Sequence, residues 1–302
     1  MRIVFMGTPE IAAMVLDSLI ASRHEVAAVV TQPDKPNTRG NAVVYSPVKQ
    51  LALDNNIPVL QPVKASAEES VAEIASYKPD IIVVAAYGQL LKSNLLELPK
   101  YRCINVHASL LPKYRGASPI QWAVINGEKE TGISIMYMEK GLDTGDVILQ
   151  KRLELAADET AGTLHDRLGE LAGPVLLEAL ELIENGSAQP VPQNDAESTY
   201  VSVFDKSMGK LDFNKSSVEL ERLIRGLIPW PGAFTYINGK MLKIWKAEIG
   251  SVDGLKPGEM YTEVPGELYI GTLDGSLRIL ELQLEGRKRM YTSDFLRGFK
   301  VC

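Results

Sequence analysis

The first half of the chain alternates short apolar runs with amphipathic segments. The apolar runs predict buried strands at 2–6, before a glycine turn at Gly7, and at 26–30, 81–84, 103–106 and 147–153. The intervening segments have the spacing and start signals of helices, and the run at 81–84 is continuous, as in a strand buried on both faces. Such alternation predicts an α/β fold with a doubly wound, mostly parallel sheet. Ligands of such sheets bind beyond the carboxyl ends of the strands.

Helix starts are predicted from capping residues. Thr8 is the expected N-cap of the first helix, with Pro9 at its first position, and Ser46-Pro47 opens the second helix. Ser66 and Glu69 have the spacing of a capping box for the third helix. A longer helix is predicted from about residue 160 to Gly186, because leucines recur on one side of it.

The pattern changes in the last third of the chain. Residues 189–205 are polar and contain prolines, as in a linker between a first domain at 1–188 and a second at 206–302. The second domain shows short strands at 234–237, 242–245, 268–271 and 277–284, with hairpin turns at Asn238-Gly239 and Asp274-Gly275. This pattern predicts a small β-barrel (OB-like), a fold that often binds oligonucleotides. Trp230 and Trp245 are expected in its core.

Composition is that of an ordinary globular protein, with 302 residues, 45% of them hydrophobic, and a net charge of -6. The charge is uneven: residues 1–205 hold 17 basic and 26 acidic groups, whereas residues 206–302 hold 15 and 12. The basic excess, with the cluster at 287–289, is only weak evidence for nucleic acid, since solvated surfaces look similar. No run approaches the ~20 apolar residues of a membrane span, and no signal peptide is evident. We therefore expect a cytoplasmic protein without a membrane partner, and a monomer by default.

Three polar side chains form a candidate site. Asn105 and His107 share one face of the predicted strand at 103–106, at its carboxyl end, and Asp143 follows in a glycine-rich turn. Each residue alone would be read as a structural or turn residue. Together, an amide, an imidazole and a carboxylate can move protons during acyl transfer. His24 and His165 are not accompanied by such polar residues in the sequence, and both are expected to have structural roles.

Other cofactor patterns are missing from the sequence. The turn at Gly7 reads Gly-Thr-Pro-Glu rather than the Gly-x-Gly-x-x-Gly of dinucleotide sites, so a packing role is expected for Gly7. The two cysteines, Cys103 and Cys302, support neither a disulfide framework nor a cysteine-rich metal site. We expect no metal.

The segment from Cys103 to Trp122, CINVHASLLPKYRGASPIQW, with KGLDTGD at 140–146, resembles the formyltetrahydrofolate-dependent formyltransferases. The segments MGTPE at 6–10, TQPDKP at 31–36 and PWPGAFT at 229–235 are most similar to the members of that family that act on methionyl-tRNA. The resemblance implies transfer of the formyl group of 10-formyltetrahydrofolate to the amino group of methionyl-initiator-tRNA, for translation initiation.

The resemblance also implies residue roles. Asn105 and His107 would stabilise the charge on the formyl oxygen, and Asp143 would orient His107 and help carry the proton of the amine. Ser109, Leu110, Leu111 and Pro112 would form the loop that holds the reduced folate. Arg39, in the segment 32–46, would contact the tRNA acceptor end, and the domain at 206–302 would assist tRNA binding.

Three alternatives remain open from the sequence. A formyltransferase acting on an amino sugar or a ribotide amine could use the same three side chains. A formyltetrahydrofolate hydrolase would use water in place of the amine. A folate-binding module without activity would have no reason to keep all three polar groups, and a fold alone does not decide between these functions.

Overall fold

The computed structural model describes residues 1–36 and 43–301, which form two compact units. Unit 1 comprises Met1–Gly116, Glu130–Glu154 and His165–Tyr200, and unit 2 comprises Ala117–Lys129, Leu155–Leu164 and Val201–Cys302. The units are therefore interleaved along the chain, whereas the sequence predicts one division at 189–205. No helix within the described ranges is long and apolar enough to cross a membrane.

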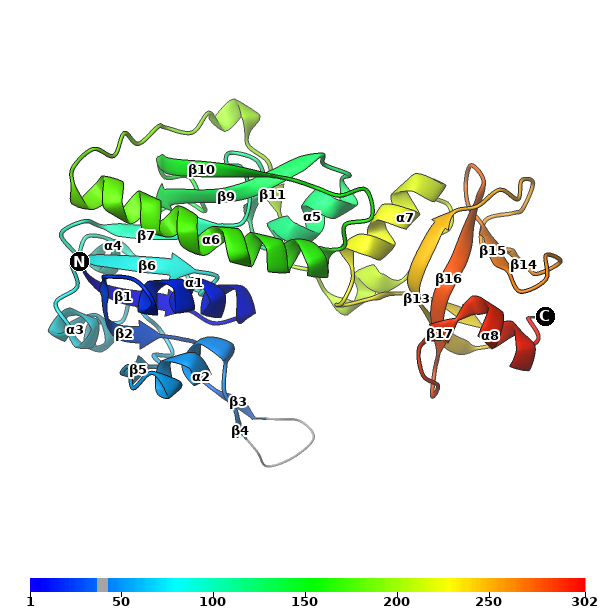
Figure 1. Cartoon of the computed structure of the whole chain (residues 1–302), viewed down its shortest axis with the longest axis horizontal. Coiled ribbons are helices and arrows are strands. Elements are labelled where there is room, and N and C mark those ends of the chain that lie inside the picture. The colour runs from blue at the N-terminus through cyan, green and yellow to red at the C-terminus, as the bar shows by residue number, and fades with distance from the viewer. Residues whose placement is uncertain (37–42, 302) are drawn as a thin grey trace. The chain divides into compact units, whose positions relative to one another are not determined.

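Unit 1 is built on a seven-stranded sheet (Figure 1). Five strands run parallel, in the order β7-β6-β1-β2-β5, and β9 and β10 add an antiparallel edge beside β7. The strand bounds are β1 Arg2–Gly7, β2 Glu25–Val30, β5 Val59–Leu60, β6 Ile81–Ala85, β7 Cys103–His107, β9 Glu130–Tyr137 and β10 Val147–Glu154. The predicted doubly wound, mostly parallel sheet is confirmed.

The central strands are buried on both faces because helices cover both faces. All five residues of β6 are buried, and so are all five of β7. One face packs against α3 and α4, and α1 and α6 cross the sheet on the side nearer the viewer in Figure 1. The helix bounds are α1 Glu10–Ile20, α2 Pro47–Asp54, α3 Glu68–Ser76, α4 Ser93–Leu96 and α6 Ala161–Glu184. Two short strands, β3 Lys35–Pro36 and β4 Val43–Val44, pair with each other.

The capping predictions had mixed outcomes. Ser46 caps α2 as expected, accepting a hydrogen bond from the backbone N–H of Lys49 at 3.1 Å. Thr8 is not a cap, because α1 begins one residue later than expected and the Thr8 hydroxyl accepts from the N–H of Gln32. The capping box at Ser66 is also wrong. Its hydroxyl accepts from the N–H of Lys92, and α3 has no side-chain cap.

Gly7 has the predicted packing role. A Cβ built on Gly7 would lie 2.8 Å from the Cβ of Ala12 and 2.8 Å from the carbonyl oxygen of Ala85. No other residue type fits there without moving the backbone of β6. The glycine therefore allows α1 to start close to the sheet.

Unit 2 contains a curled antiparallel sheet, a half-barrel consistent with the predicted small β-barrel class (Figure 1). Its strands follow the order β12-β13-β16-β15-β14, with β17 paired to β16. The bounds are β12 Ala233–Ile237, β13 Lys240–Ile249, β14 Met260–Tyr261, β15 Leu268–Gly271, β16 Ser276–Leu284 and β17 Met290–Tyr291. The predicted hairpin turn between β12 and β13 is confirmed, and Asn238 and Gly239 both have a positive φ, as its geometry requires.

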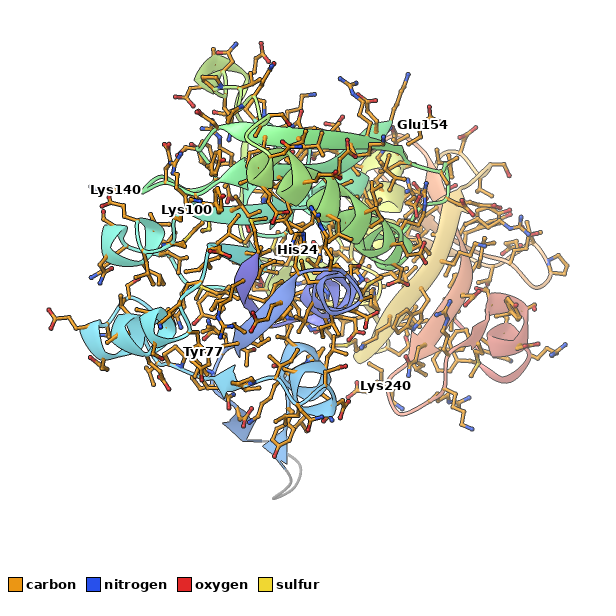
Figure 2. All side chains as sticks on the ribbon, turned by 60° about the vertical axis from the view of Figure 1, so that its left-hand side comes forward. His24, Tyr77, Lys100, Lys140, Glu154 and Lys240 are labelled. Carbon is orange, nitrogen blue, oxygen red and sulfur yellow. The ribbon has the colours of Figure 1, made fainter. Side chains whose placement is uncertain are left out.

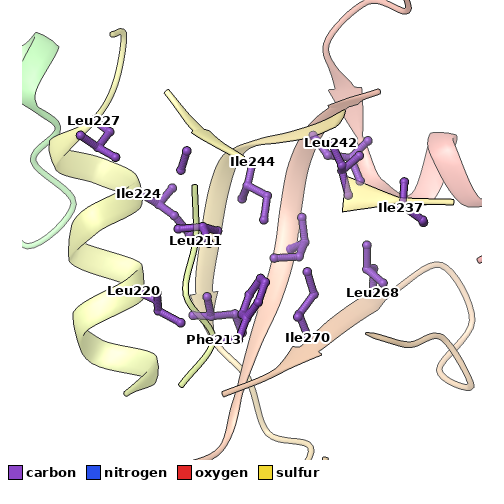
Figure 3. Close-up of a cluster of buried hydrophobic side chains, with 14 of the residues drawn as sticks. Leu211, Phe213, Leu220, Ile224, Leu227, Ile237, Leu242, Ile244, Leu268 and Ile270 are labelled. Atoms are coloured by element: carbon purple, nitrogen blue, oxygen red, sulfur yellow. The ribbon is translucent and has the colours of Figure 1, made fainter. Parts of the chain in front are cut away.

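The core of unit 2 lies between this sheet and α7, Ser217–Gly226 (Figure 3). Leu220 and Ile224 of α7 face Leu211, Phe213 and Ile244 across the core. A capping box formed by Ser216 and Glu219 starts α7. The remaining elements of this part of the chain are α5 Pro119–Ile125, η2 Lys206–Gly209 and α8 Thr292–Gly298.

The two tryptophans expected in this core lie elsewhere. Trp230 is 52% exposed. Trp245 is only half-buried on the outer face of β13, because inward-facing positions alternate along the strand and are occupied by Leu242 and Ile244. The core prediction for both residues was wrong.

Candidate functional site

Asn105 and His107 lie where β7 reaches the carboxyl edge of the unit 1 sheet. Asn105 is in register with Val84 of the parallel strand β6, and His107 ends the strand. Their period-two spacing directs both side chains to one face, as predicted. Asn105 is 9% exposed and His107 is 6% exposed, so both polar groups are largely removed from water.

Asp143 reaches the same place from the loop between β9 and β10. Its Oδ1 accepts a hydrogen bond from Asn105 Nδ2 at 3.4 Å, and its Oδ2 lies 3.7 Å from His107 Nδ1. The backbone N–H of Gly116 also donates to Oδ2, at 2.8 Å. The three residues singled out from the sequence are thus brought together in one cluster.

The Tyr114 carbonyl determines which nitrogen of His107 can exchange a proton. His107 Nε2 lies 2.9 Å from that oxygen. A carbonyl only accepts hydrogen bonds, so Nε2 carries the hydrogen in the neutral ring. Nδ1, which faces Asp143, is then the basic nitrogen. A proton taken up at Nδ1 produces an imidazolium directly beside a carboxylate.

The predicted folate loop, Ser109 to Pro112, is held by buried hydrogen bonds. Ser134 of β9 is fully buried, and its hydroxyl donates to the Ser109 carbonyl at 2.6 Å and accepts from the Leu111 N–H at 3.1 Å. Gln150 of β10 donates to the Leu111 carbonyl and to the Ser134 hydroxyl, both at 2.8 Å. Ser109 itself donates to the Lys113 carbonyl at 2.7 Å. The loop backbone is therefore fixed directly beside His107.

The Asp143 loop adopts a backbone conformation that needs support. Asp143 has a φ of 54°, in the left-handed region that few non-glycine residues adopt. Two residues on, a Cβ built on Gly145 would lie 1.9 Å from the Tyr137 carbonyl oxygen. The loop thus folds tightly against the end of β9. Strain of this kind persists only where the surroundings hold the backbone.

The segment proposed to reach tRNA is described only at its ends. Arg39 lies outside the described residues. Asp34, before the gap, forms an ion pair with Lys49 and accepts a hydrogen bond from Gln61 at 2.9 Å. The hydrogen bond from Lys49, followed by that from Gln61, holds the pKa of Asp34 below its usual value.

The other histidines and the buried cysteine have structural surroundings. His24, labelled in Figure 2, lies just before β2, and its Nδ1 is 3.1 Å from the Met1 amino nitrogen. Burial lowers the pKa of His24. His165 pairs with its neighbour Asp166, and burial raises the pKa of the Cys103 thiol to about 12. Within residues 1–36 and 43–301, no group of three or more His, Cys, Asp or Glu residues could hold a metal ion.

The outer face of the unit 2 sheet combines cations with aromatic rings. The Lys243 ammonium and the Arg289 guanidinium lie 5.9 Å and 5.0 Å from the centre of the Trp245 ring. Phe234 and Tyr236 of the neighbouring strand stand edge to face, and Tyr236 is 49% exposed. Exposed aromatic rings with nearby cations are suited to contact with nucleic acid.

Known families match both parts of the chain. Residues 1–180 match the formyl transferase family, and residues 204–300 match the formyl transferase C-terminal domain. A methionyl-tRNA formyltransferase of Lachnospira eligens is 53% identical over 99% of this chain and 96% of its own length. Another, from Agathobacter rectalis, is 48% identical over 100% of this chain and 97% of its own. The chain belongs to the methionyl-tRNA formyltransferase family.

Solved structures share the fold at lower identity. An N-formyltransferase from Helicobacter canadensis, in complex with folinic acid and dTDP-3-aminofucose, is 22% identical with a TM-score of 0.69, over 95% of this chain and 99% of that one. HypX from Aquifex aeolicus, in complex with tetrahydrofolic acid, is 20% identical with a TM-score of 0.65, over 98% of this chain and 47% of that one. At these identities the likeness concerns the fold alone.

Within this member of the methionyl-tRNA formyltransferase family, the sequence did not point to every residue that supports the site. Ser134 of β9 and Gln150 of β10 hydrogen-bond to the predicted folate loop, and Gln193 contacts the Asp143 loop from the segment expected to be a linker. Serine and glutamine in a strand or a polar segment carry no motif. Only the tertiary contacts identify them.

Proposed function

We propose that this chain transfers the formyl group of 10-formyltetrahydrofolate to the amino group of methionyl-initiator-tRNA, giving N-formylmethionyl-tRNA and tetrahydrofolate. The observation that carries the proposal is the cluster at the sheet's carboxyl edge, in which the Asp143 carboxylate lies 3.4 Å from Asn105 Nδ2 and 3.7 Å from His107 Nδ1. Its acceptor is suggested by relatives about half identical over nearly the whole chain, which are named methionyl-tRNA formyltransferases.

The site residues divide the reaction between them. The amine attacks the formyl carbon, a new C–N bond forms, and charge develops on the formyl oxygen. Asn105 Nδ2 donates to that oxygen, and protonated His107 adds a second donor from Nδ1, since Nε2 is occupied by the Tyr114 carbonyl. Asp143 stabilises the imidazolium and, directly or through water, accepts the proton of the amine.

The second half of the reaction breaks the bond between the formyl carbon and N10 of the folate. The proton that Asp143 accepted passes to this leaving nitrogen, so that tetrahydrofolate departs neutral at N10. In the proposal the loop Ser109, Leu110, Leu111 and Pro112 holds the folate. Ser134 and Gln150 support this role, because they fix the loop backbone at both Ser109 and Leu111.

Residues 1–188 would form the catalytic domain, with 189–205 leading to a domain at 206–302 that assists tRNA binding. Arg39 would contact the acceptor end. The outer face of the unit 2 sheet, with Lys243 and Arg289 on the Trp245 ring, supports the second role, because cations attract phosphates and exposed rings stack on bases.

An acceptor competition tests the proposal. Protein is incubated with 10-formyltetrahydrofolate and an equimolar mixture of methionyl-initiator-tRNA and a nucleotide-linked amino sugar, and formylated products and free formate are quantified. We expect formylmethionyl-tRNA as the main product. Formylated sugar as the main product, or formate without a formylated acceptor, would overturn the proposal in favour of a sugar formyltransferase or a hydrolase.

A further inference from the structure

We infer that Gln193 is a positioning residue of the reaction: its side-chain amide holds the Asp143 loop in its reactive conformation. The inference rests on the proposed function of Asp143. Gln193 lies in the segment between α6 and β11, Tyr200–Val201, and it donates to backbone carbonyls of the Asp143 loop rather than to the Asp143 carboxylate. It acts on the backbone that carries this carboxylate.

The hydrogen bonds of Gln193 are directed at the loop. Its Nε2 donates to the carbonyl oxygens of Asp143 at 2.8 Å and of Gly145 at 2.7 Å. These two carbonyls flank the tight turn in which Asp143 has a positive φ. Both hydrogens of the amide group are therefore used to clamp one turn.

The orientation of the amide is fixed from its other end. Gln193 Oε1 accepts a hydrogen bond from Arg115 Nε at 3.0 Å. A guanidinium can only donate, so this side of the amide must be the oxygen, and the NH₂ group must face the loop. The assignment of the amide thus follows from its partners.

Arg115 is in turn immobilised. Its side chain is 1% exposed, and its two terminal nitrogens donate to the Tyr200 hydroxyl at 2.9 Å and to Asp195 at 2.7 Å. Burial alone would lower the pKa of Arg115, but the hydrogen bonds to Asp195 and Tyr200 raise it overall. The guanidinium therefore remains a charged donor, held in place, for the side-chain oxygen of Gln193.

The segment has separate attachments to the rest of unit 1 that do not involve the Gln193 side chain. Val191 and Val147 exchange two backbone hydrogen bonds, at 2.9 Å and 2.8 Å, and Arg115 N–H donates to the Thr199 carbonyl at 2.8 Å. The segment can stay in place without the Gln193 side chain. Loss of that side chain should therefore release the Asp143 turn more than it destabilises the fold.

The test compares Gln193→Ala and Gln193→Glu with the wild-type protein. Glutamate keeps the acceptor for Arg115 but replaces the clamp with a carboxylate that repels both loop carbonyls. Formyl transfer from 10-formyltetrahydrofolate to methionyl-tRNA is measured at saturating substrates. We expect kcat to fall about 10- to 100-fold in both variants with KM values within about 2-fold, because displacing a catalytic group by about 1 Å costs on the order of 100-fold.

The matched control is Asn194→Ala. Asn194 is the adjacent amide residue, but its side chain hydrogen-bonds to Ala196 and Glu197 within its own segment rather than to the Asp143 loop. We expect its kcat within about 2-fold of wild type. Hydrogen exchange of the peptide covering 141–147 should accelerate in both Gln193 variants and not in Asn194→Ala.

A double-mutant cycle with Asp143→Asn separates positioning from a general structural role. If Gln193 acts through Asp143, Gln193→Ala should cause no further loss of kcat in the Asp143→Asn background. Multiplicative losses, or full kcat in both single Gln193 variants, would overturn the inference while leaving the proposed function intact. If Asp143→Asn alone leaves kcat unchanged, the proposed role of Asp143 fails, and this inference fails with it.

Discussion

The carboxyl edge of the unit 1 sheet and the outer face of the unit 2 sheet both gather polar groups, but they hold them differently. At the edge, His107 is 6% exposed and bonded to a backbone carbonyl, and Asp143 is bonded to a backbone N–H. On the outer face, the Arg289 side chain is 50% exposed and is held by Glu281 and the Trp245 ring. Buried, backbone-anchored groups suit directional chemistry, whereas exposed cations suit attraction to a polyanion. This difference predicts that turnover and tRNA affinity can be lost separately.

The largest expected effect is on turnover. Asn105→Ala should lower kcat by about 100- to 1000-fold, the typical loss when one donor to a developing oxyanion is removed. The dissociation constant for tRNA, measured by filter binding, should stay within about 2-fold. An equal weakening of tRNA binding would contradict the comparison, because residues at the carboxyl edge of the unit 1 sheet would then contribute to tRNA affinity.

A smaller effect is expected at Ser134, which supports the proposed folate loop through hydrogen bonds to its backbone. Ser134→Ala leaves the Leu111 N–H and the Ser109 carbonyl without their buried partner, a cost of about 1–3 kcal/mol. We expect KM for 10-formyltetrahydrofolate to rise about 10-fold, with a smaller change in kcat. Ser76→Ala is the control, since the Ser76 hydroxyl bonds only its own helix, and an equal rise in KM there would contradict the role of Ser134.

Substitutions on the outer face of the unit 2 sheet should change the affinity for tRNA without changing turnover. Arg289→Ala should weaken tRNA binding about 3- to 10-fold and reduce the slope of log affinity against log salt by about 0.7–0.9, the contribution of one phosphate contact. Arg297→Ala is the control in the same unit, since its side chain is 77% exposed and lies on α8. Equal losses from both arginines would mean that net charge, rather than this face, determines affinity.

The smallest effect concerns stability and leaves both functions intact. Ser216→Ala removes the capping box of α7 and should lower the free energy of unfolding by about 1 kcal/mol. Ser66→Ala, in the same Ser-x-x-Glu pattern but without a cap on α3, should cost less. Thermal unfolding compares the two variants, and an equal or larger loss at Ser66 would contradict the assignment.

The sequence could predict what depends on local pattern. The apolar run at β6 and the turn at Asn238-Gly239 specify their conformations through burial and positive φ, and both elements lie where expected. The spacing of Asn105 and His107 likewise places them on one face of β7. Their approach to Asp143 was predicted from the joint motif and is found in the structure.

Long-range contacts could not be predicted in this way. Ser66 and Ser216 carry the same capping pattern, but Ser66 finds a tertiary partner in Lys92 and Ser216 does not. Trp245 was expected in the core, yet strand alternation places it on the outer face of β13. Gln193 meets the Asp143 loop only because distant segments pack together, which no local pattern encodes.

The role of the Asn105, His107 and Asp143 cluster is tested most directly by a single-turnover experiment with His107→Ala. Enzyme in excess, saturated with 10-formyltetrahydrofolate, is mixed with methionyl-initiator-tRNA, and formylmethionyl-tRNA is followed with time while tRNA binding is measured in parallel. We expect a rate at least about 100-fold below wild type with tRNA affinity unchanged. A wild-type rate of formyl transfer in His107→Ala would contradict this role.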